Sequence, residues 1–205
     1  MTEKTAQKEP GKKPKPQQEV VVQISLSELH PFPDHPFQVR EDASMQETAE
    51  SVNEYGVLVP ALARPREDGG YELIAGHRRK HACELAGLAT MPVIVRDIDR
   101  DTATIIMVDS NLQRENILPS ERAKAYKMKM EAIKRQGART DLTSPKISAK
   151  FRSDDEVGQD AGVSGDTIRN YIALTQLVPE LQQMVDEKKI ALSPAYQLAA
   201  LTPKE

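Results

Sequence analysis

The chain has 205 residues, of which 39% are hydrophobic and 4% aromatic, so two small domains or one large one would have mainly aliphatic cores. A single cysteine excludes an internal disulfide and a cysteine-based zinc cluster, and no apolar run approaches the ~20 residues of a membrane span. The net charge is −3, but basic residues concentrate at 76–81, 122–139 and 146–152, so a nucleic-acid partner is not excluded. We expect a cytoplasmic protein without a membrane partner.

The first 18 residues contain mostly lysine, proline and glutamine and almost nothing apolar. Such a segment cannot bury enough surface to fold alone, so residues 1–18 are expected to form a disordered basic arm.

Strand-like and helix-like patterns alternate from residue 20 to residue 98. Ser44 is a candidate N-cap of the first helix, and Gly56 is its expected C-terminal stop. The alternation predicts one small α/β layer domain over 19–100. The expected strands are 20–29, 57–65, 70–76 and 91–98, and the expected helices are 44–56 and 78–88.

From residue 101 the pattern becomes wholly helical. The stretch 119–137 begins with proline, contains strong helix formers and has Gly137 at its expected end. The expected segments are connecting helices over 101–137, a loop or linker over 138–151 and an all-α domain spanning 138–205.

Residues 154–174 have the pattern of a helix-turn-helix. Gly158 would let the two helices approach, Gly162 would form the turn, and Ser164 would cap the second helix. The residues expected to pack inward are Val157, Ala161, Val163, Ile168 and Tyr171.

The remaining positions of the second helix would face outward, where a recognition helix meets the major groove. Arg169 could donate two hydrogen bonds to guanine, and Asn170 could pair with adenine. A helical hairpin without a DNA contact is the alternative interpretation. The candidate DNA-binding residues are Ser164, Gly165, Thr167, Arg169 and Asn170.

The stretch "IAGHRRKHACELAG", residues 74–87, places a glycine, a histidine and three cations at the start of an expected helix. Free N–H groups and the helix dipole favour an anion there. Gly76 would let the backbone approach a phosphate, and Arg78 and Arg79 would donate charge-assisted hydrogen bonds. The glycine spacing matches neither the P-loop nor the dinucleotide fingerprint. A phosphate site and a solvated helix start both remain open from this stretch alone.

A second polar group lies at the junction of the two expected connecting helices and includes Asp109, Asn111, Arg114 and Glu115. Carboxylate and amide oxygens at such a junction suit Mg²⁺, which proteins hold through one or two groups plus substrate phosphates. Elsewhere, Cys83 is expected to be a small buried hydrophobe. His77 and His81 are not expected to bind zinc, because arginines surround them.

Together these stretches resemble the ParB family of DNA-partition proteins. Four segments are similar, in the same order, to family boxes: Asn-Pro-x-Gln-Pro-Arg, Gly-Ile-x-Gln-Pro-x-x-Val-Arg, Gly-Glu-Arg-Arg-x-Arg-Ala, and Glu-Asn-Leu-Gln-Arg followed by Leu-x-Pro-x-Glu-x-Ala. The corresponding segments are "HPFQVR" (35–40), "YGVLVPALARP" (55–65), "GHRRKHA" (76–82) and "SNLQRENILPSERAKAY" (110–126). The resemblance spans about 20–203.

The resemblance implies an α+β protein: a small α/β nucleotide-binding domain of the ParB/sulfiredoxin-like type, then an all-α helix-turn-helix DNA-binding domain. It implies CTP and Mg²⁺ as cofactors and a palindromic centromere-like site on double-stranded DNA. Two N-terminal domains of a homodimer would close around DNA as a sliding clamp that serves segregation of a chromosome, plasmid or integrative element. Such a protein would be associated with the nucleoid.

The family's functional residues map onto matching positions of this sequence. Gln38 and His77 match positions linked to CTP hydrolysis, Asn111 matches a Mg²⁺ ligand, and Ser193 lies where the family has a second site-reading helix. Asp109, from the same helix junction, is a further candidate Mg²⁺ ligand. The implied CTP-binding residues are Val59, Pro60, Gly76, His77, Arg78, Arg79, Asn111 and Arg114.

Two positions depart from the family pattern. The box glutamate linked to hydrolysis is His77 here, and the glutamate before Asn111 is Ser110. A neutral imidazole can accept a proton but is not a carboxylate base. Nucleotide binding is therefore expected more firmly than turnover, and a weak CTPase activity stays open.

The resemblance also bears on partners. Lys12, Lys13 and Lys15 of the arm are candidates for contacting a ParA-type Walker ATPase. Family members continue into a C-terminal dimerisation domain, so a chain ending at Glu205 is expected to be a truncated form without it. Two alternatives remain: a transcriptional regulator whose N-terminal domain does not use CTP, and a small-molecule enzyme of the same N-terminal fold.

Overall fold

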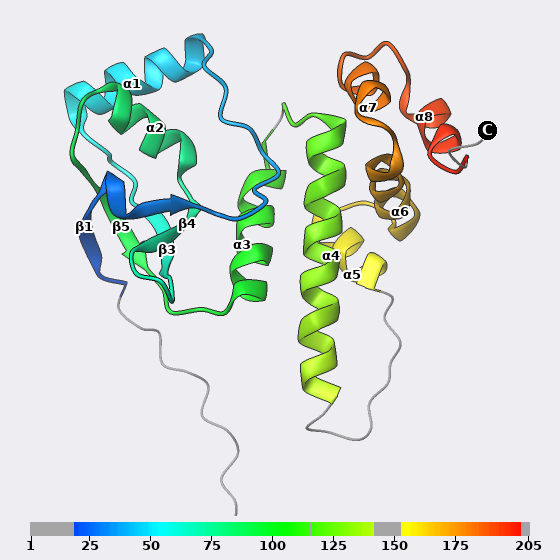
Figure 1. Ribbon diagram of the computed structural model, residues 1–205, viewed down its shortest axis with the longest axis horizontal. Coiled ribbons are helices and arrows are strands. Elements are labelled where there is room, and N and C mark those ends of the chain that lie inside the picture. The colour runs from blue at the N-terminus through cyan, green and yellow to red at the C-terminus, as the bar shows by residue number, and fades with distance from the viewer. Residues whose placement is uncertain (1–18, 115, 142–152, 202–205) are drawn as a thin grey trace, which may run out of the picture.

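The computed structural model describes residues 19–114, 116–141 and 153–201 (Figure 1). The predictions for the arm 1–18 and for linker residues 142–151 lie outside these ranges.

A five-stranded mixed sheet with the order β1-β5-β3-β4-β2 forms the centre of the N-terminal part. β1 pairs antiparallel with β5 and β3 antiparallel with β4, whereas the β3–β5 and β2–β4 pairs are parallel. The strands are β1 (Val21–Ser25), β2 (Leu29–Pro31), β3 (Ala61–Pro65), β4 (Tyr71–Ala75) and β5 (Thr90–Val95).

The prediction of one strand over 20–29 was wrong, because the segment forms two strands. A 3-10 turn, η1 (Leu26–Glu28), divides it into β1 and β2, which lie at opposite edges of the sheet. The Leu26 N–H donates to the Ala89 carbonyl across the turn (3.0 Å). The alternation of residue types predicted extended backbone correctly, but the pairing partner decided where each strand ends.

Helices cover both faces of the sheet, because alternate strand residues point to opposite sides. Ala61, Ala63 and Leu73 pack against α1 (Ala43–Tyr55) and α2 (His77–Leu85). Ile74 points to the other face and packs in a cluster with α3 (Arg100–Leu112). Cys83 is fully buried in the first of these cores, as a small hydrophobe would be.

The N-cap prediction for α1 was wrong by two residues. The Met45 N–H donates to Asp42 Oδ1 (2.9 Å), so Asp42 and not Ser44 caps the helix. The predicted stop is confirmed, because Gly56 follows α1 with φ of 71°.

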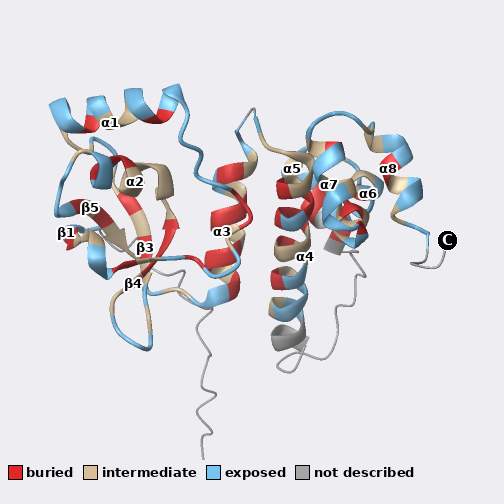
Figure 2. Ribbon diagram, turned by 45° about the horizontal axis from the view of Figure 1, so that its top comes forward, coloured by how far each residue is buried: buried red, intermediate tan, exposed pale blue. Residues whose placement is uncertain are grey.

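The long helix α4 (Pro119–Asp141) begins at the expected proline and joins the two parts of the molecule. It packs on α3 through Ala125 and on the C-terminal helices through Ala123 and Tyr126. Figure 2 shows buried residues recurring along both α3 and α4. Gly137 does not end the helix, because a glycine inside a helix costs only about 1 kcal/mol and four more residues continue the turn.

Among its described residues, the C-terminal part contains helices and no strand, as predicted. Its elements are α5 (Ser153–Ala161), α6 (Gly165–Ala173), η2 (Leu174–Gln176), α7 (Pro179–Asp186) and α8 (Leu192–Leu198). Among the helices described, none has both the length and the apolar content required to cross a bilayer.

Candidate functional site

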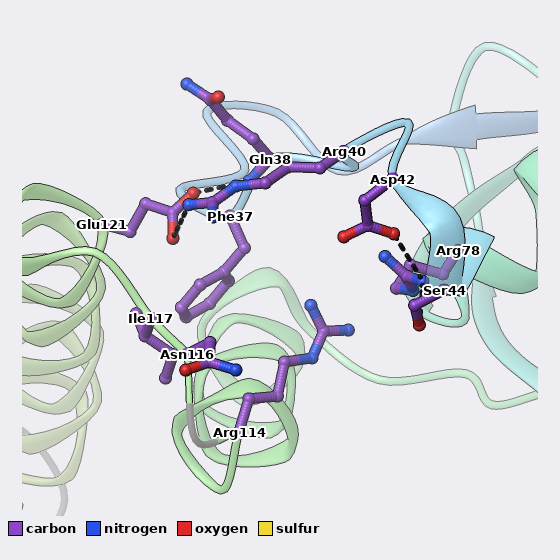
Figure 3. A pocket seen from close by; sticks show the side chains of 10 residues that line it. All are labelled: Phe37, Gln38, Arg40, Asp42, Ser44, Arg78, Arg114, Asn116, Ile117 and Glu121. Atoms are coloured by element: carbon purple, nitrogen blue, oxygen red, sulfur yellow. Dashed lines mark hydrogen bonds and ion pairs between the residues drawn. The ribbon is translucent and has the colours of Figure 1, made fainter.

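A cavity of about 470 Å³ lies where three separate segments meet (Figure 3). These segments are the loop before α1, the first turn of α2 and the connection between α3 and α4. The lining residues are Phe37, Gln38, Arg40, Asp42, Ser44, Arg78, Arg114, Asn116, Ile117 and Glu121. Three arginines against two carboxylates make this a cavity suited to an anion.

The start of α2 depends on Gly76. Its φ of 111° is strained for any residue with a side chain, and a Cβ there would lie 2.8 Å from the Ala61 Cβ. The glycine is therefore required first for packing the helix start against β3. Gly76 has no side chain to cap the helix, so no side-chain cap hydrogen bond satisfies the first N–H groups of α2.

Arg78 and Arg79 point to different partners. Arg78 lines the cavity, where its Nη2 donates to Ser44 Oγ (3.1 Å) and lies 3.6 Å from Asp42 Oδ1 (Figure 3). Arg79 Nη1 donates to the carbonyl oxygens of Val59 (2.6 Å) and Pro60 (2.5 Å). Arg78 thus lines the cavity, whereas Arg79 holds the loop before β3.

This loop brings the predicted base-contacting residues beside the helix start. Val59 is 65% exposed, and Pro60 immediately precedes β3. Burial lowers the pKa of Arg79 from its ordinary value, although an arginine stays charged at neutral pH. The hydrogen bonds from the Arg79 guanidinium to the loop carbonyls are therefore charge-assisted and partly shielded from water.

Arg114 approaches the cavity from the α3 side (Figure 3). Burial lowers its pKa, and repulsion from Arg78 and Arg79 adds to this, while Glu121 partly offsets the effect. Like charges held this closely repel each other. An anion between Arg78 and Arg114 would relieve the repulsion.

We call the cavity lined by Arg40, Arg78 and Arg114 the arginine cavity. Gln38 lines it, but His77 does not. His77 lines a neighbouring cavity of about 250 Å³. Its ring centroid is 4.0 Å from that of His35, and its Nε2 is buried without a hydrogen-bond partner among the described residues. Burial, followed by repulsion from His35, Arg114 and Lys80, lowers the pKa of His77 to about 3. His77 is therefore neutral at physiological pH.

The two candidate Mg²⁺ ligands lie in different surroundings. Asn111 is 3% exposed, its Nδ2 donates to the Met107 carbonyl (2.8 Å), and its Oδ1 has no hydrogen-bond partner in the described part of the chain. That buried acceptor fits the part of a single protein ligand to a cation. The described residues contain no group of three histidine, cysteine or acidic side chains that could hold a metal alone.

Asp109 does not fit the metal role. Its Oδ1 accepts from Lys129 Nζ (2.7 Å), and it lines a different cavity, together with Asp160. Residues two apart on a helix point about 200° apart, so the two candidate Mg²⁺ ligands Asp109 and Asn111 face different sides of α3.

Glu121 is a site residue that the sequence interpretation missed. It is 7% exposed, accepts from the N–H groups of Gln38 and Leu118 (both 3.1 Å), and lies 3.9 Å from Arg40. The signal was present, since a glutamate three residues after a helix N-cap is typical of a capping box. Glu121 anchors the Gln38 backbone to the start of α4.

The helix-turn-helix has the predicted local geometry. Gly162 has φ of 68°, and a Cβ on Gly158 would lie 2.6 Å from the Val163 carbonyl oxygen. Ser164 Oγ accepts from the Thr167 N–H (3.2 Å), which confirms the cap. Val157 and Ile168 are fully buried in one cluster with Tyr126 of α4.

The outward face of α6 differs from the prediction at Gly165. Gly165 is buried against Asp155 and does not face outward, because α5 and α6 cross at that residue. Arg169 forms ion pairs with Asp154 of α5 and Asp166 of α6, which raise its pKa. Asn170, by contrast, is exposed.

Tyrosines set the position of α6 on its neighbours. The Tyr171 ring contacts the rings of Tyr126 on α4 and Tyr196 on α8, at centroid distances of 5.7 and 6.3 Å. The Arg122 guanidinium lies 5.8 Å from the Tyr171 centroid. Ser193, in the first turn of α8, is exposed.

Comparison with known proteins gives two family matches. The ParB N-terminal domain matches residues 11–112, and the ParB HTH domain matches residues 145–205. The chromosome-partitioning protein Spo0J of Thermus thermophilus is 34% identical over 186 residues, which is 90% of this chain and 62% of that protein. A probable chromosome-partitioning protein ParB of Treponema pallidum is 37% identical over 159 residues, or 78% of this chain and 44% of that protein.

This chain therefore spans about half of the length of these relatives. Among solved structures, the C-terminally truncated ParB of Caulobacter crescentus complexed to the centromeric parS site is similar, with a TM-score of 0.56 and 26% identity. The match covers 89% of this chain and 86% of that one.

Proposed function

The chain belongs to the ParB family, and we propose that it is a site-specific DNA-binding partition protein whose N-terminal domain binds CTP with Mg²⁺. A homodimer closing as a sliding clamp on double-stranded DNA would segregate a chromosome, plasmid or integrative element. The observation that carries the proposal is the convergence of Arg78 and Arg114 on one cavity from different segments.

A triphosphate would supply negative charge to this cavity, whose lining has more arginines than carboxylates. Arg78 would donate to phosphate oxygens from the first turn of α2, where free N–H groups also favour an anion. Arg114 would approach from the opposite side. The loop at Val59 and Pro60, held by Arg79, would present its backbone and exposed side chains to the base.

Asn111 is the residue that would hold Mg²⁺, through its Oδ1, which has no hydrogen-bond partner among the described residues. When bound, the ion would neutralise charge on the phosphate oxygens, which provide most of its remaining ligands. Asn111 lies within a turn of Arg114, whose N–H donates to the Asn111 carbonyl (3.0 Å). The cation and phosphate functions would therefore share the end of α3.

Turnover is proposed to be slow. His77, in the position of the family's box glutamate, has a pKa of about 3 and is a weak base at neutral pH. Gln38 would orient a water molecule, and its backbone is fixed by Glu121. Phosphate release from CTP on bound DNA, measured for the wild type and for His77→Glu, is expected to be faster in the variant. Equal rates would assign the slow step elsewhere.

The DNA interface would be the outward face of α6. Thr167 and Asn170 are accessible there, and Ser164 adds a capped helix start that suits a backbone phosphate. Arg169 would have to exchange its Asp166 partner for a guanine. In a dimer, two such modules would read half-sites about one helical turn apart.

Calorimetric titration with CTP, ATP and GTP in the presence of Mg²⁺ tests the nucleotide proposal. The wild type is expected to bind CTP in preference, and Arg78→Ala to weaken binding about 10- to 100-fold, the loss expected for charge-assisted hydrogen bonds. Arg66→Ala is the matched control, because Arg66 lies on the β3–β4 turn and pairs only loosely with Asp68 (3.8 Å). Absence of nucleotide binding by the wild type would favour a plain transcriptional regulator.

A further inference from the structure

A buried lysine joins the two parts of the molecule. Lys129 lies in the middle of α4 with a side-chain exposure of 1%. Its Nζ donates to Asp109 Oδ1 on α3 (2.7 Å) and to Asp160 Oδ2 on α5 (2.9 Å). One ammonium group of α4 therefore links α3 and α5.

The buried ammonium of Lys129 depends on both carboxylates for its stabilisation. Burial alone would lower the pKa of Lys129, but the hydrogen bonds that it donates to Asp109 and Asp160 outweigh burial and raise the pKa above its ordinary value. The two carboxylates are 45% and 55% exposed, so water can solvate either of them without the lysine. The ammonium cannot be solvated in its place, and it depends on both partners remaining close.

The two carboxylates lie near different candidate sites: Asp109 near the arginine cavity, and Asp160 near the turn of the helix-turn-helix. Asp109 is in the last turn of α3, two residues before Asn111 and five before Arg114, which lines the arginine cavity. Asp160 is in the last turn of α5, two residues before Gly162, whose turn leads into α6. A shift of either helix end by about 1 Å would break a hydrogen bond to a buried charge for which the described side chains provide two acceptors, Asp109 and Asp160.

We propose that Lys129 is a positioning residue that couples the nucleotide site to the helix-turn-helix, an inference that rests on the function proposed above. Occupancy of the arginine cavity sets the position of the α3 end, and the Lys129 ammonium transmits that position to α5. By thermodynamic linkage, DNA and CTP then change each other's affinity by the same factor.

A second ion pair provides the matched control. Arg135 Nε donates to Asp101 Oδ1 (2.7 Å), which also links α4 to α3. Asp101 lies at the other end of α3, and the Arg135 side chain is 51% exposed. Loss of this pair removes an α3–α4 contact without touching α5.

The experiment measures the CTP dissociation constant by calorimetry with and without the tightest-binding duplex selected from random-sequence DNA. The variants are Lys129→Met, which keeps the length without the charge, then Asp160→Asn, Asp160→Glu and Arg135→Met. The wild type is expected to show coupling of about tenfold. Lys129→Met and Asp160→Asn should reduce the coupling factor to about 1–2, while CTP affinity without DNA stays within about threefold. Asp160→Glu and Arg135→Met should retain the wild-type coupling factor.

Folding of each variant is checked by circular dichroism. If Lys129→Met does not fold, Asp160→Asn decides, because its exposed position tolerates a neutral amide and leaves Asp109 to the lysine. Unchanged coupling in Asp160→Asn, or a wild type that binds both ligands without coupling, would overturn the inference and leave the proposed function standing. A wild type that binds neither CTP nor any duplex would remove the proposed function itself.

Discussion

Substitution of Gly76 by alanine tests whether the start of α2 is held by packing. Two costs are expected. A residue with a Cβ at φ of 111° costs about 1–2 kcal/mol, and the 2.8 Å approach to the Ala61 Cβ adds about 1–3 kcal/mol of overpacking. The free energy of unfolding should therefore fall by about 2–5 kcal/mol.

Gly87→Ala separates the two costs. Gly87 also has positive φ, at 71°, but a Cβ there would meet nothing within 4 Å. Its substitution should cost only the backbone part, about 1–2 kcal/mol. Urea unfolding of both variants, followed by circular dichroism, measures the difference. If Gly76→Ala costs no more than Gly87→Ala, the close contact with β3 does not constrain the helix start.

Three further outcomes are expected. Asn170→Ala should weaken binding to the selected duplex by about 1–3 kcal/mol in fluorescence anisotropy while leaving the salt dependence unchanged; a reduced salt slope would assign Asn170 to a phosphate instead. Ser164→Ala should lower the free energy of unfolding by about 1 kcal/mol through loss of the α6 cap, and Ser44→Ala, which removes no cap, should not. Because the folded state lowers the pKa of His77 from 6.5 to about 3, the unfolded state binds more protons below pH 6.5, so stability should fall with decreasing pH by up to about 1.4 kcal/mol per unit. His77→Gln should flatten that dependence between pH 6.5 and 5, and parallel curves would show that the imidazole is not desolvated.

The helix-turn-helix could be predicted in detail because its determinants are local. Gly158, Gly162 and Ser164 act on backbone within a few residues of themselves, and Ile168 follows at helical spacing. The one miss, Gly165, concerns the crossing of two helices. Its burial depends on how closely α5 approaches, which periodicity does not report.

Boundaries were less predictable than elements. Both Asp42 and Ser44 are good N-cap residues, and the choice between them depends on where the incoming loop meets the cavity wall. Gly137 is a plausible helix end that α4 simply passes. The division of 20–29 into two edge strands depends on pairing with β5 and β4, far along the chain.

The amino-acid sequence by itself determined the kinds of element, the turn and cap of the DNA-binding motif, and the presence of a cationic helix start, because each depends on side chains within one or two helical turns. Tertiary structure alone decided which cation meets which partner. It assigned Arg78 to the cavity, Arg79 to the loop carbonyls, and Asp109 to a buried lysine that also holds α5. Charges act over a few ångströms in space, and that separation is set by the packing of α3 and α4 rather than by distance along the chain.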